Sequence, residues 1–147
     1  MFKHILIPTD GSKLALKGIK AGVKLAAALG AKVTGVYVIA PYTPPMYGEG
    51  SVYIPGISVQ AYRKATERQA KKALAAVEVE AQTADVPCTT RFVTAERPFE
   101  GILKSARARC DAIVMASHGR SGLGGLLLGS ETTRVLASSK IPVLVIR

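Results

Sequence analysis

Five short apolar runs alternate with helix-like segments along the chain, and this alternation constrains the fold more than any other feature. The expected strands cover residues 2–8, 32–39, 88–94, 111–117 and 141–146. The expected helices run from about Ser12 to Gly30, over 57–84, from Pro98 onward, and over 130–139. Apolar strands joined by helices are typical of a parallel sheet covered on both faces. With 147 residues, the chain is expected to form a single α/β domain, residues 1–147, as a three-layer sandwich.

A glycine-rich stretch between residues 116 and 130 joins the fourth expected strand to the last expected helix. Flexible backbone and a helix N-terminus therefore lie at the carboxyl end of a strand. The unpaired N–H groups of such a helix start favour an anion, above all a phosphate. Gly119, Gly129 and Ser130 are the best candidates to contact it. The stretch is neither a Walker A motif nor a dinucleotide-binding fingerprint, and a tight turn with glycines at unusual dihedral angles is the alternative.

Polar side chains in and after this stretch supply the chemistry of an anion site. Ser130 is expected to cap the following helix, and the backbone N–H groups of Ser130, Glu131 and Thr132 are expected to face the anion. The Thr132 hydroxyl adds a donor, whereas the Glu131 carboxylate suits a helix N-terminus but repels phosphate unless it points away. Arg120 is a candidate electrostatic partner, with a solvent-facing position as the alternative. His118 could act as a general base, but no nucleophile is evident beside it, so a binding or loop-shaping role is favoured.

Three motifs in this chain resemble those of a known family. The first is Ile5-Leu6-Ile7-Pro8-Thr9-Asp10-Gly11-Ser12, and the last is Ile141-Pro142-Val143-Leu144-Val145-Ile146. Between them, Ala116-Ser117-His118-Gly119 is followed by nine residues and then Gly129-Ser130. Over essentially its whole length the chain is similar to universal stress proteins of the UspA family. The nucleotide-binding branch of that family carries glycine, two residues, glycine, nine residues, and glycine with serine or threonine; here alanine replaces only the first glycine.

The resemblance implies a Rossmann-like, five-stranded parallel sheet of strand order 3-2-1-4-5 that binds an adenine nucleotide, ATP with or without magnesium. In a sheet of that order, ligands bind where the order reverses, outside the carboxyl ends of strands 1 and 4. By resemblance, Pro8 and Thr9 border the adenine pocket, and the backbone of Val38 meets the adenine edge. Asp10 would lie near the ribose or a metal–water shell. The family also implies a homodimer that pairs through the C-terminal strand.

Ala116 is the main departure from the family pattern. A methyl group matters there if the backbone needs a positive φ or if the ligand approaches closely. At a strand end with an ordinary φ, alanine is tolerated. Two hypotheses therefore stay open. The favoured one is an ATP-binding regulatory protein of the stress response, with an unidentified protein partner and at most slow ATP hydrolysis. The alternative is a nucleotide-free dimeric interaction scaffold of the same fold.

Composition narrows the possible partners. The net charge of +10 attracts polyanions, but four of the lysines recur at helical spacing without interleaved aromatic residues, as on a solvated helix face: Lys13, Lys17, Lys20 and Lys24. A specific nucleic-acid site is therefore not expected. No apolar run approaches the ~20 residues that a membrane span needs, and the chain start lacks a signal-peptide layout, so a cytoplasmic protein without membrane contact is expected. Cys88 and Cys110 lack zinc-site spacing and are expected to be buried free thiols.

Overall fold

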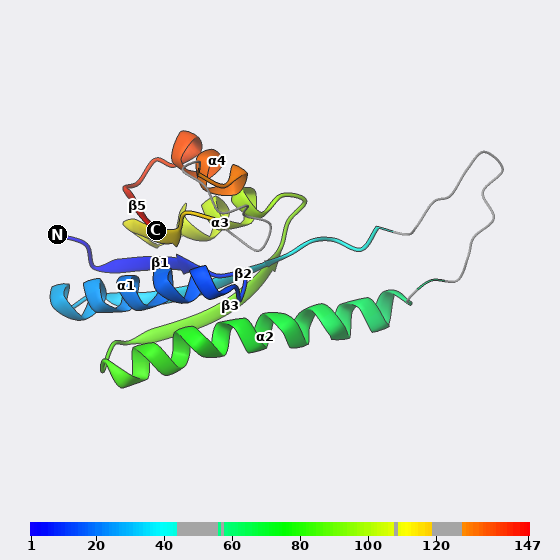
Figure 1. Ribbon diagram of the computed structural model, residues 1–147, viewed down its shortest axis with the longest axis horizontal. Coiled ribbons are helices and arrows are strands. Elements are labelled where there is room, and N and C mark those ends of the chain that lie inside the picture. Colours follow the sequence, from blue (N-terminus) through cyan, green and yellow to red (C-terminus); the bar gives the residue numbers. More distant parts are fainter. Residues whose placement is uncertain (44–55, 57, 108, 119–127) are drawn as a thin grey trace.

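One parallel sheet organises the structure, a computed structural model that describes residues 1–43, 56, 58–107, 109–118 and 128–147 (Figure 1). Its strands are β1 His4–Pro8, β2 Lys32–Ile39, β3 Cys88–Thr94, β4 Ala112–Ala116 and β5 Val143–Ile146. They lie in the order β3-β2-β1-β4-β5, and every neighbouring pair is parallel. The α/β fold and the strand order 3-2-1-4-5 are therefore confirmed.

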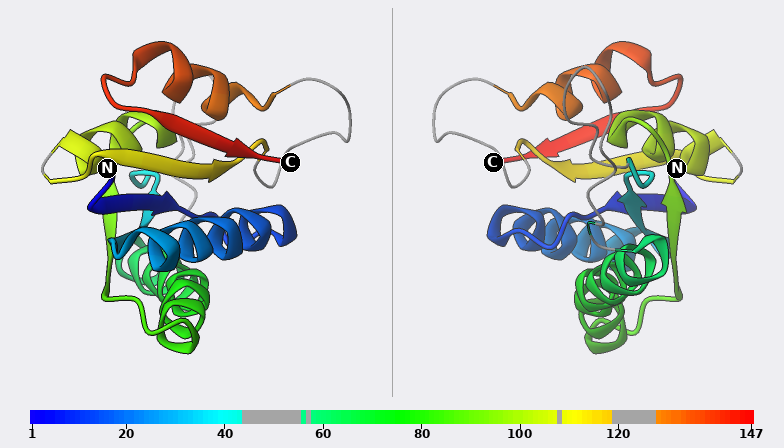
Figure 2. Two further views of the ribbon diagram at one scale, coloured as in Figure 1. Left: turned by 90° about the vertical axis from the view of Figure 1, so that its left-hand side faces the viewer. Right: turned by 90° about the vertical axis from the view of Figure 1, so that its right-hand side faces the viewer.

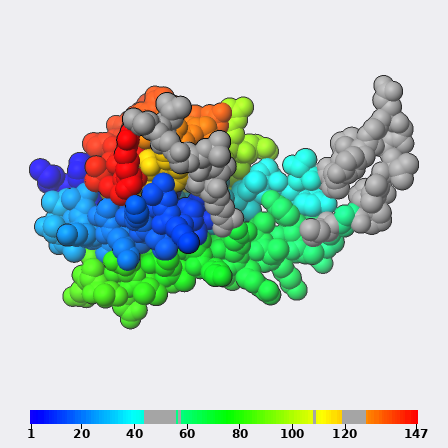
Figure 3. Space-filling model, viewed as in Figure 1, coloured from blue at the N-terminus to red at the C-terminus, as the bar shows by residue number. Residues whose placement is uncertain are grey.

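Four helices in the described part of the chain cover the two faces of the sheet. They are α1 Lys13–Leu29, α2 Val59–Thr83, α3 Pro98–Arg107 and α4 Ser130–Ser138. α1 and α2 cover one face, and α3 and α4 cover the other (Figure 1 and Figure 2). α1 and α2 contact each other and form one continuous side of the surface (Figure 3). The chain thus has the three layers that its alternating pattern predicts.

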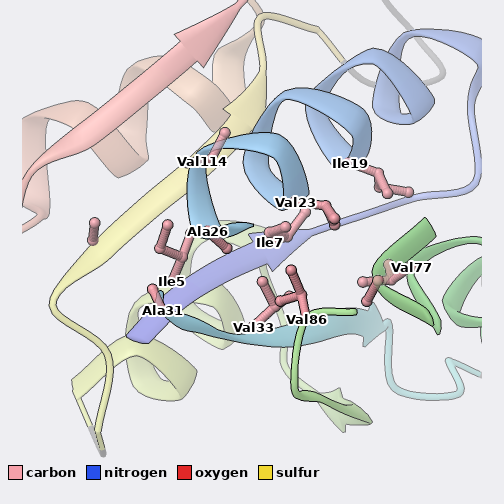
Figure 4. Packing of buried hydrophobic residues seen from close by; sticks show 12 residues of the cluster. Ile5, Ile7, Ile19, Val23, Ala26, Ala31, Val33, Val77, Val86 and Val114 are labelled. Carbon is pink, nitrogen blue, oxygen red and sulfur yellow. The ribbon is translucent and has the colours of Figure 1, made fainter. Parts of the chain in front are cut away.

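The side chains of β1 divide the interior into two cores, because successive residues in a strand point to opposite faces. Ile5 and Ile7 are fully buried among the residues that α1, α2 and the neighbouring strands contribute (Figure 4). Leu6 is fully buried on the opposite face, where it packs in the cluster that contains Val135 of α4. Side chains on both faces of the central strand are therefore buried, as expected for a parallel sheet.

α1 has the ends and the exposed face that its sequence predicts. The side chain of Ser12 caps it by accepting a hydrogen bond of 3.1 Å from the Ala15 N–H. Gly30 ends it in the left-handed region, with a φ of 62° that favours glycine. The helix lies very close to the sheet, since a Cβ built on Gly22 would be 2.6 Å from Cδ1 of Ile7. Its four evenly spaced lysines are all exposed.

β5 begins two residues later than expected because a local turn occupies the preceding backbone. The Ser139 hydroxyl donates to the Ile141 carbonyl at 2.7 Å and accepts from the Ile141 N–H at 3.2 Å. Ile141 is therefore bonded within its own turn, and Pro142 has no N–H to give to a strand ladder. The strand forms at the outer edge of the sheet, beside β4.

The two cysteines are free, as expected, but both are half-buried rather than fully buried. Burial raises the pKa of Cys88 and of Cys110, which keeps both thiols protonated near neutral pH. None of the helices in the described ranges is long and apolar enough to cross a membrane.

Candidate functional site

A cavity of about 360 Å³ opens at the carboxyl ends of β1, β2 and β4. The starts of α3 and α4 contribute its remaining walls. This is the point where the strand order reverses, since β2 and β4 flank β1 and their connections run to opposite faces of the sheet. We call this cavity the carboxyl-end crevice. Its volume falls within the range that small-molecule sites occupy, roughly 300–1,000 Å³.

All the described residues of the expected site line this crevice. They are Pro8, Thr9, Asp10, Val38, Ala116, His118, Gly129, Ser130, Glu131 and Thr132. Gly119 and Arg120 lie outside the described residues. The structure thus brings together residues that come from four segments far apart in the sequence.

The backbone that follows β1 is held in place by one bond to β2 and two local hydrogen bonds. The Thr9 N–H donates to the Val36 carbonyl at 2.9 Å, which extends the β1–β2 contact to the crevice. The Thr9 hydroxyl accepts from the Gly11 N–H at 3.1 Å, and the Asp10 carboxylate accepts from the Ser12 N–H at 2.9 Å. Gly11 has a φ of 77°, which the tight turn requires. The Asp10 carboxylate is therefore oriented by its own turn at the crevice wall.

α4 presents its first backbone N–H groups to the crevice. The helix begins at Ser130, and its N-cap residue is Gly129, which provides no side-chain cap. The expectation that Ser130 caps the helix is therefore wrong, because Ser130 already has helical geometry. The N–H groups of Ser130, Glu131 and Thr132 lie in the first turn, where helix geometry supplies no acceptor. The same three residues form part of the cavity wall, so the positive end of the helix dipole lies at the crevice.

The start of α4 is anchored to the end of β4 by two hydrogen bonds. The Gly129 N–H donates to the Ser117 carbonyl at 2.8 Å. The Thr132 hydroxyl, whose residue is only 3% exposed, donates to the Ala116 carbonyl at 3.1 Å. The Thr132 hydroxyl is thus used for anchoring and is not free to face a ligand as expected. A Cβ on Gly129 would lie 3.2 Å from the Ser117 carbonyl oxygen, so the close approach favours glycine there.

Glu131 points its carboxylate toward α3. Oε2 accepts from the Phe99 N–H in the first turn of α3 at 2.8 Å, and Oε1 accepts from Nη1 of Arg134 at 2.6 Å. Arg134 also stands over the Phe99 ring, 5.8 Å from its centroid. The carboxylate therefore joins the N-terminus of α3 to α4, and the two bonds offset part of its negative charge at the crevice.

Ala116 has an ordinary backbone conformation. It ends β4, and the positive φ values in the described ranges belong to Asp85, Gly11 and Gly30. Its side chain shares the sheet face of Val114, two residues earlier, which is the face that α1 covers. α1 approaches closely there, since a Cβ on Gly18 would be 3.1 Å from the Ala116 nitrogen. The alanine methyl thus needs no special backbone geometry and is directed toward α1.

His118 lies at the crevice wall with its Nδ1 atom 3.0 Å from the Ser117 hydroxyl. Besides this imidazole, the described residues of the wall contribute the carboxylates of Asp10 and Glu131. Within the described ranges, no three His, Cys, Asp or Glu residues form a metal-binding group. The described wall therefore offers anion-binding amides and a polar edge, without an evident catalytic pair.

Apolar residues that the sequence did not point to form much of the crevice wall. They are Ala15, Val36, Tyr37, Pro98, Ile102 and Met115, with Tyr37 and Ile102 among the largest. Positions at the carboxyl ends of strands 2 and 4 could have been included from the expected topology alone. Pro98 and Ile102 could not, because the tilt of α3 over the sheet decides which of its residues reach the cavity.

A model of the universal stress protein family matches residues 1–147. The chain belongs to this family. A universal stress protein of Thermus aquaticus is 33% identical to it, with all of both chains covered. The chain also resembles solved universal stress proteins in its overall fold.

Two of those solved structures contain an adenine nucleotide. A universal stress protein in complex with cAMP has a TM-score of 0.72 and 24% identity, and the match covers 99% of this chain and 97% of that one. A universal stress protein of Archaeoglobus fulgidus in complex with dAMP has a TM-score of 0.61 and 17% identity, with 100% and 98% covered. At these identities the likeness concerns the fold.

Proposed function

We propose that this protein binds an adenine nucleotide, ATP, in the carboxyl-end crevice, as a regulatory ligand in the stress response. The observation that carries the proposal is the first turn of α4, whose residues Ser130, Glu131 and Thr132 line the cavity and whose N–H groups have no acceptor within the helix. Three amide donors at the positive end of a helix suit a phosphate group. The complexes of related proteins with cAMP and dAMP support the choice of adenine nucleotides.

The rest of the wall fits the other parts of a nucleotide. Val36, Val38 and Ile102 provide the apolar surface that a purine ring needs. Pro8 and Thr9 would border the same ring, and Asp10 at the next position would face the ribose or a magnesium–water shell. Gly119 and Arg120 would add a backbone contact and a positive charge to the phosphates.

Binding, rather than turnover, is the activity proposed. Phosphoryl transfer needs a positioned nucleophile and charges that stabilise the transferred group. His118 contacts the Ser117 hydroxyl, and the described wall adds only two carboxylates to it. We therefore expect slow hydrolysis at most. Occupancy of the crevice would then bias the surface that this protein offers to an unidentified protein partner.

Two experiments test the proposal. One sample of the purified protein is denatured, and any released small molecule is identified by mass spectrometry. A second, folded sample is titrated calorimetrically with ATP, ADP and AMP, each with and without magnesium. Saturable binding, or an adenine nucleotide released on denaturation, is the expected result. No heat at millimolar nucleotide and no released nucleotide would leave the nucleotide-free scaffold as the better description. Hydrolysis that is lost in His118→Ala would instead overturn the assignment as a binding protein.

A homodimer is proposed through β5. This strand lies at the edge of the sheet, with Leu144 47% exposed, so its outer backbone groups and an apolar side chain are available to a second copy. Antiparallel pairing of two β5 strands would cover both edges with one symmetric contact. Light scattering after gel filtration should give a dimer mass for the natural chain and a monomer mass for Leu144→Lys.

A further inference from the structure

A second cavity, of about 560 Å³, lies at the opposite end of the sheet from the crevice. Its lining residues come from the amino ends of β1, β2 and β3 and from the end of α3. Figure 1 shows these strand ends on the side of the sheet where the chain starts. We call this second cavity the amino-end pocket. α3 and α4 cover one face of the sheet but leave the amino end of the edge strand β3 open on that face. Thr89 and Arg91 of β3 are therefore exposed.

The amino-end pocket is lined by cations without a carboxylate among them. Lys32, Arg91 and Arg109 contribute three positive charges to its described wall. Two carboxylates lie just outside this wall and are already bonded: Asp111 accepts from the N–H groups of Lys3 and His4 at 2.8 and 3.1 Å, and Glu78 accepts from the Thr90 hydroxyl. Among the described residues, the wall of the crevice has two carboxylates and neither lysine nor arginine. Charge therefore distinguishes the two cavities and favours an anion in this one.

Hydrogen-bond donors accompany these charges. Nη2 of Arg91 donates to the Ser105 carbonyl at 2.9 Å, which fixes the guanidinium against the end of α3 and leaves its other N–H groups for a ligand. The hydroxyls of Thr34 and Thr89 are 3.0 Å apart and line the same wall. Oxyanions such as phosphate accept several bonds from such arginine and hydroxyl donors.

His4 forms part of the wall of the amino-end pocket. The residue is only 9% exposed, and its Nε2 atom is 2.7 Å from the Thr34 hydroxyl. Its Nδ1 atom is buried, and the backbone at Arg109 acts on the ring as a hydrogen-bond partner. The imidazole is therefore held by Thr34 and by the backbone of Arg109, and its resonance reports on the charges around the pocket.

We propose that the amino-end pocket binds a small phosphate-bearing anion, either inorganic phosphate or the phosphoryl group of a small metabolite. Lys32 and Arg109 attract the anion, Arg91 and the Thr89 hydroxyl donate to its oxygens, and His4 lies in the pocket wall. This site is independent of the nucleotide crevice, and binding weakens as salt rises because the pocket is open to solvent.

The two histidines of the chain are separate reporters, because His4 lies in the amino-end pocket and His118 in the crevice. Burial, followed by the charge of Lys32, lowers the pKa of His4. A bound anion opposes the field of the cations and raises that pKa. Inorganic phosphate is added at constant pH and ionic strength while the ring resonances of both histidines are followed by NMR, and the pKa of each is measured at saturation.

The expected result is a saturable shift of the His4 resonance and a raised pKa of His4. Lys32→Gln with Arg109→Gln should weaken this response at least about tenfold, since two charge-assisted contacts are lost. Both side chains are exposed, so the fold should tolerate the change. The matched control, Lys20→Gln with Lys24→Gln on the exposed face of α1, removes the same charge and should bind as the natural chain does.

Three results would overturn the proposal: no saturable response of His4, a response of His118 alone, or equal weakening in the control variant. A response of His118 alone would support the crevice, and ATP calorimetry tests the crevice separately, so the two proposals fail independently. Glucose 6-phosphate is titrated in parallel. Tighter binding than that of inorganic phosphate identifies a metabolite phosphoryl group as the ligand, and weaker binding identifies free phosphate.

Discussion

The hydrogen bond from Thr132 to the Ala116 carbonyl should hold the anion-binding end of α4 in place. Thr132→Val keeps the shape of the side chain and its branching but removes the hydroxyl. The bond is 3.1 Å long and Thr132 is 3% exposed, so no water can easily replace the donor. We expect a loss of about 1–2 kcal/mol in the free energy of unfolding, from the bond itself and the carbonyl left without this donor. For a chain of this size that corresponds to a shift of roughly 0.5–1 M in the urea midpoint.

Thr133→Val is the matched control for this change. The Thr133 hydroxyl donates to the Gly129 carbonyl at 3.1 Å, but Thr133 is exposed, so water can take over its bonds. Its cost should stay within about 0.5 kcal/mol. Urea unfolding followed by circular dichroism measures both variants, and ATP titration should show weaker binding for Thr132→Val alone. Equal midpoints for the two variants would refute the assignment of Thr132 as the anchor of α4.

Three further predictions concern the core, the pH dependence and the crevice. Gly22→Ala should destabilise by about 1–2 kcal/mol because its Cβ would meet Cδ1 of Ile7 at 2.6 Å. Ile7→Val removes that atom, so a urea double-mutant cycle should give a favourable coupling of about 1 kcal/mol, and additive effects would contradict the contact. Since burial and Lys32 lower the pKa of His4, the unfolded chain binds more protons, and stability should fall as the pH drops below about 6.5. The free energy of unfolding should depend less steeply on pH in His4→Gln. An unchanged dependence would mean that groups other than His4 cause it. Glu131→Gln should bind ATP up to about fivefold more tightly, because a carboxylate leaves the phosphate side of the crevice; calorimetry showing weaker binding would mean that the bond to Phe99 matters more than the charge.

The sequence predicted the elements of the fold well because each is marked by local chemistry. Ser12 and Gly30 mark the ends of α1, and apolar runs mark the strands. The strand order could not be predicted from the pattern of apolar residues; it followed from the family resemblance. Local signals were also insufficient at Ser130. The serine was expected to cap α4, but the tertiary bond from Gly129 to Ser117 moves the cap one residue earlier.

The two cavities differ in how far the sequence could reveal them. The crevice residues cluster in motifs at the ends of β1 and β4, and those within the described ranges do meet there. The amino-end pocket has no such signal, because Lys32, Arg91 and Arg109 come from three separate segments. Only the packing of β3 beside β2 and the position where α3 ends bring these charges together.

Ser130 offers the most direct test of the claim that backbone amides of α4 hold a phosphate. Ser130→Pro removes one N–H at the first helical position, where proline is well tolerated. Gly129 before it has φ −61° and ψ 151°, which are values that a residue preceding proline adopts. Ser130→Ala removes only the hydroxyl and keeps the N–H. Calorimetry with ATP should show about tenfold or greater weakening for Ser130→Pro, as expected for a lost bond to a charged group, and little change for Ser130→Ala. Equal affinities in the two variants, with both folded, would contradict the account.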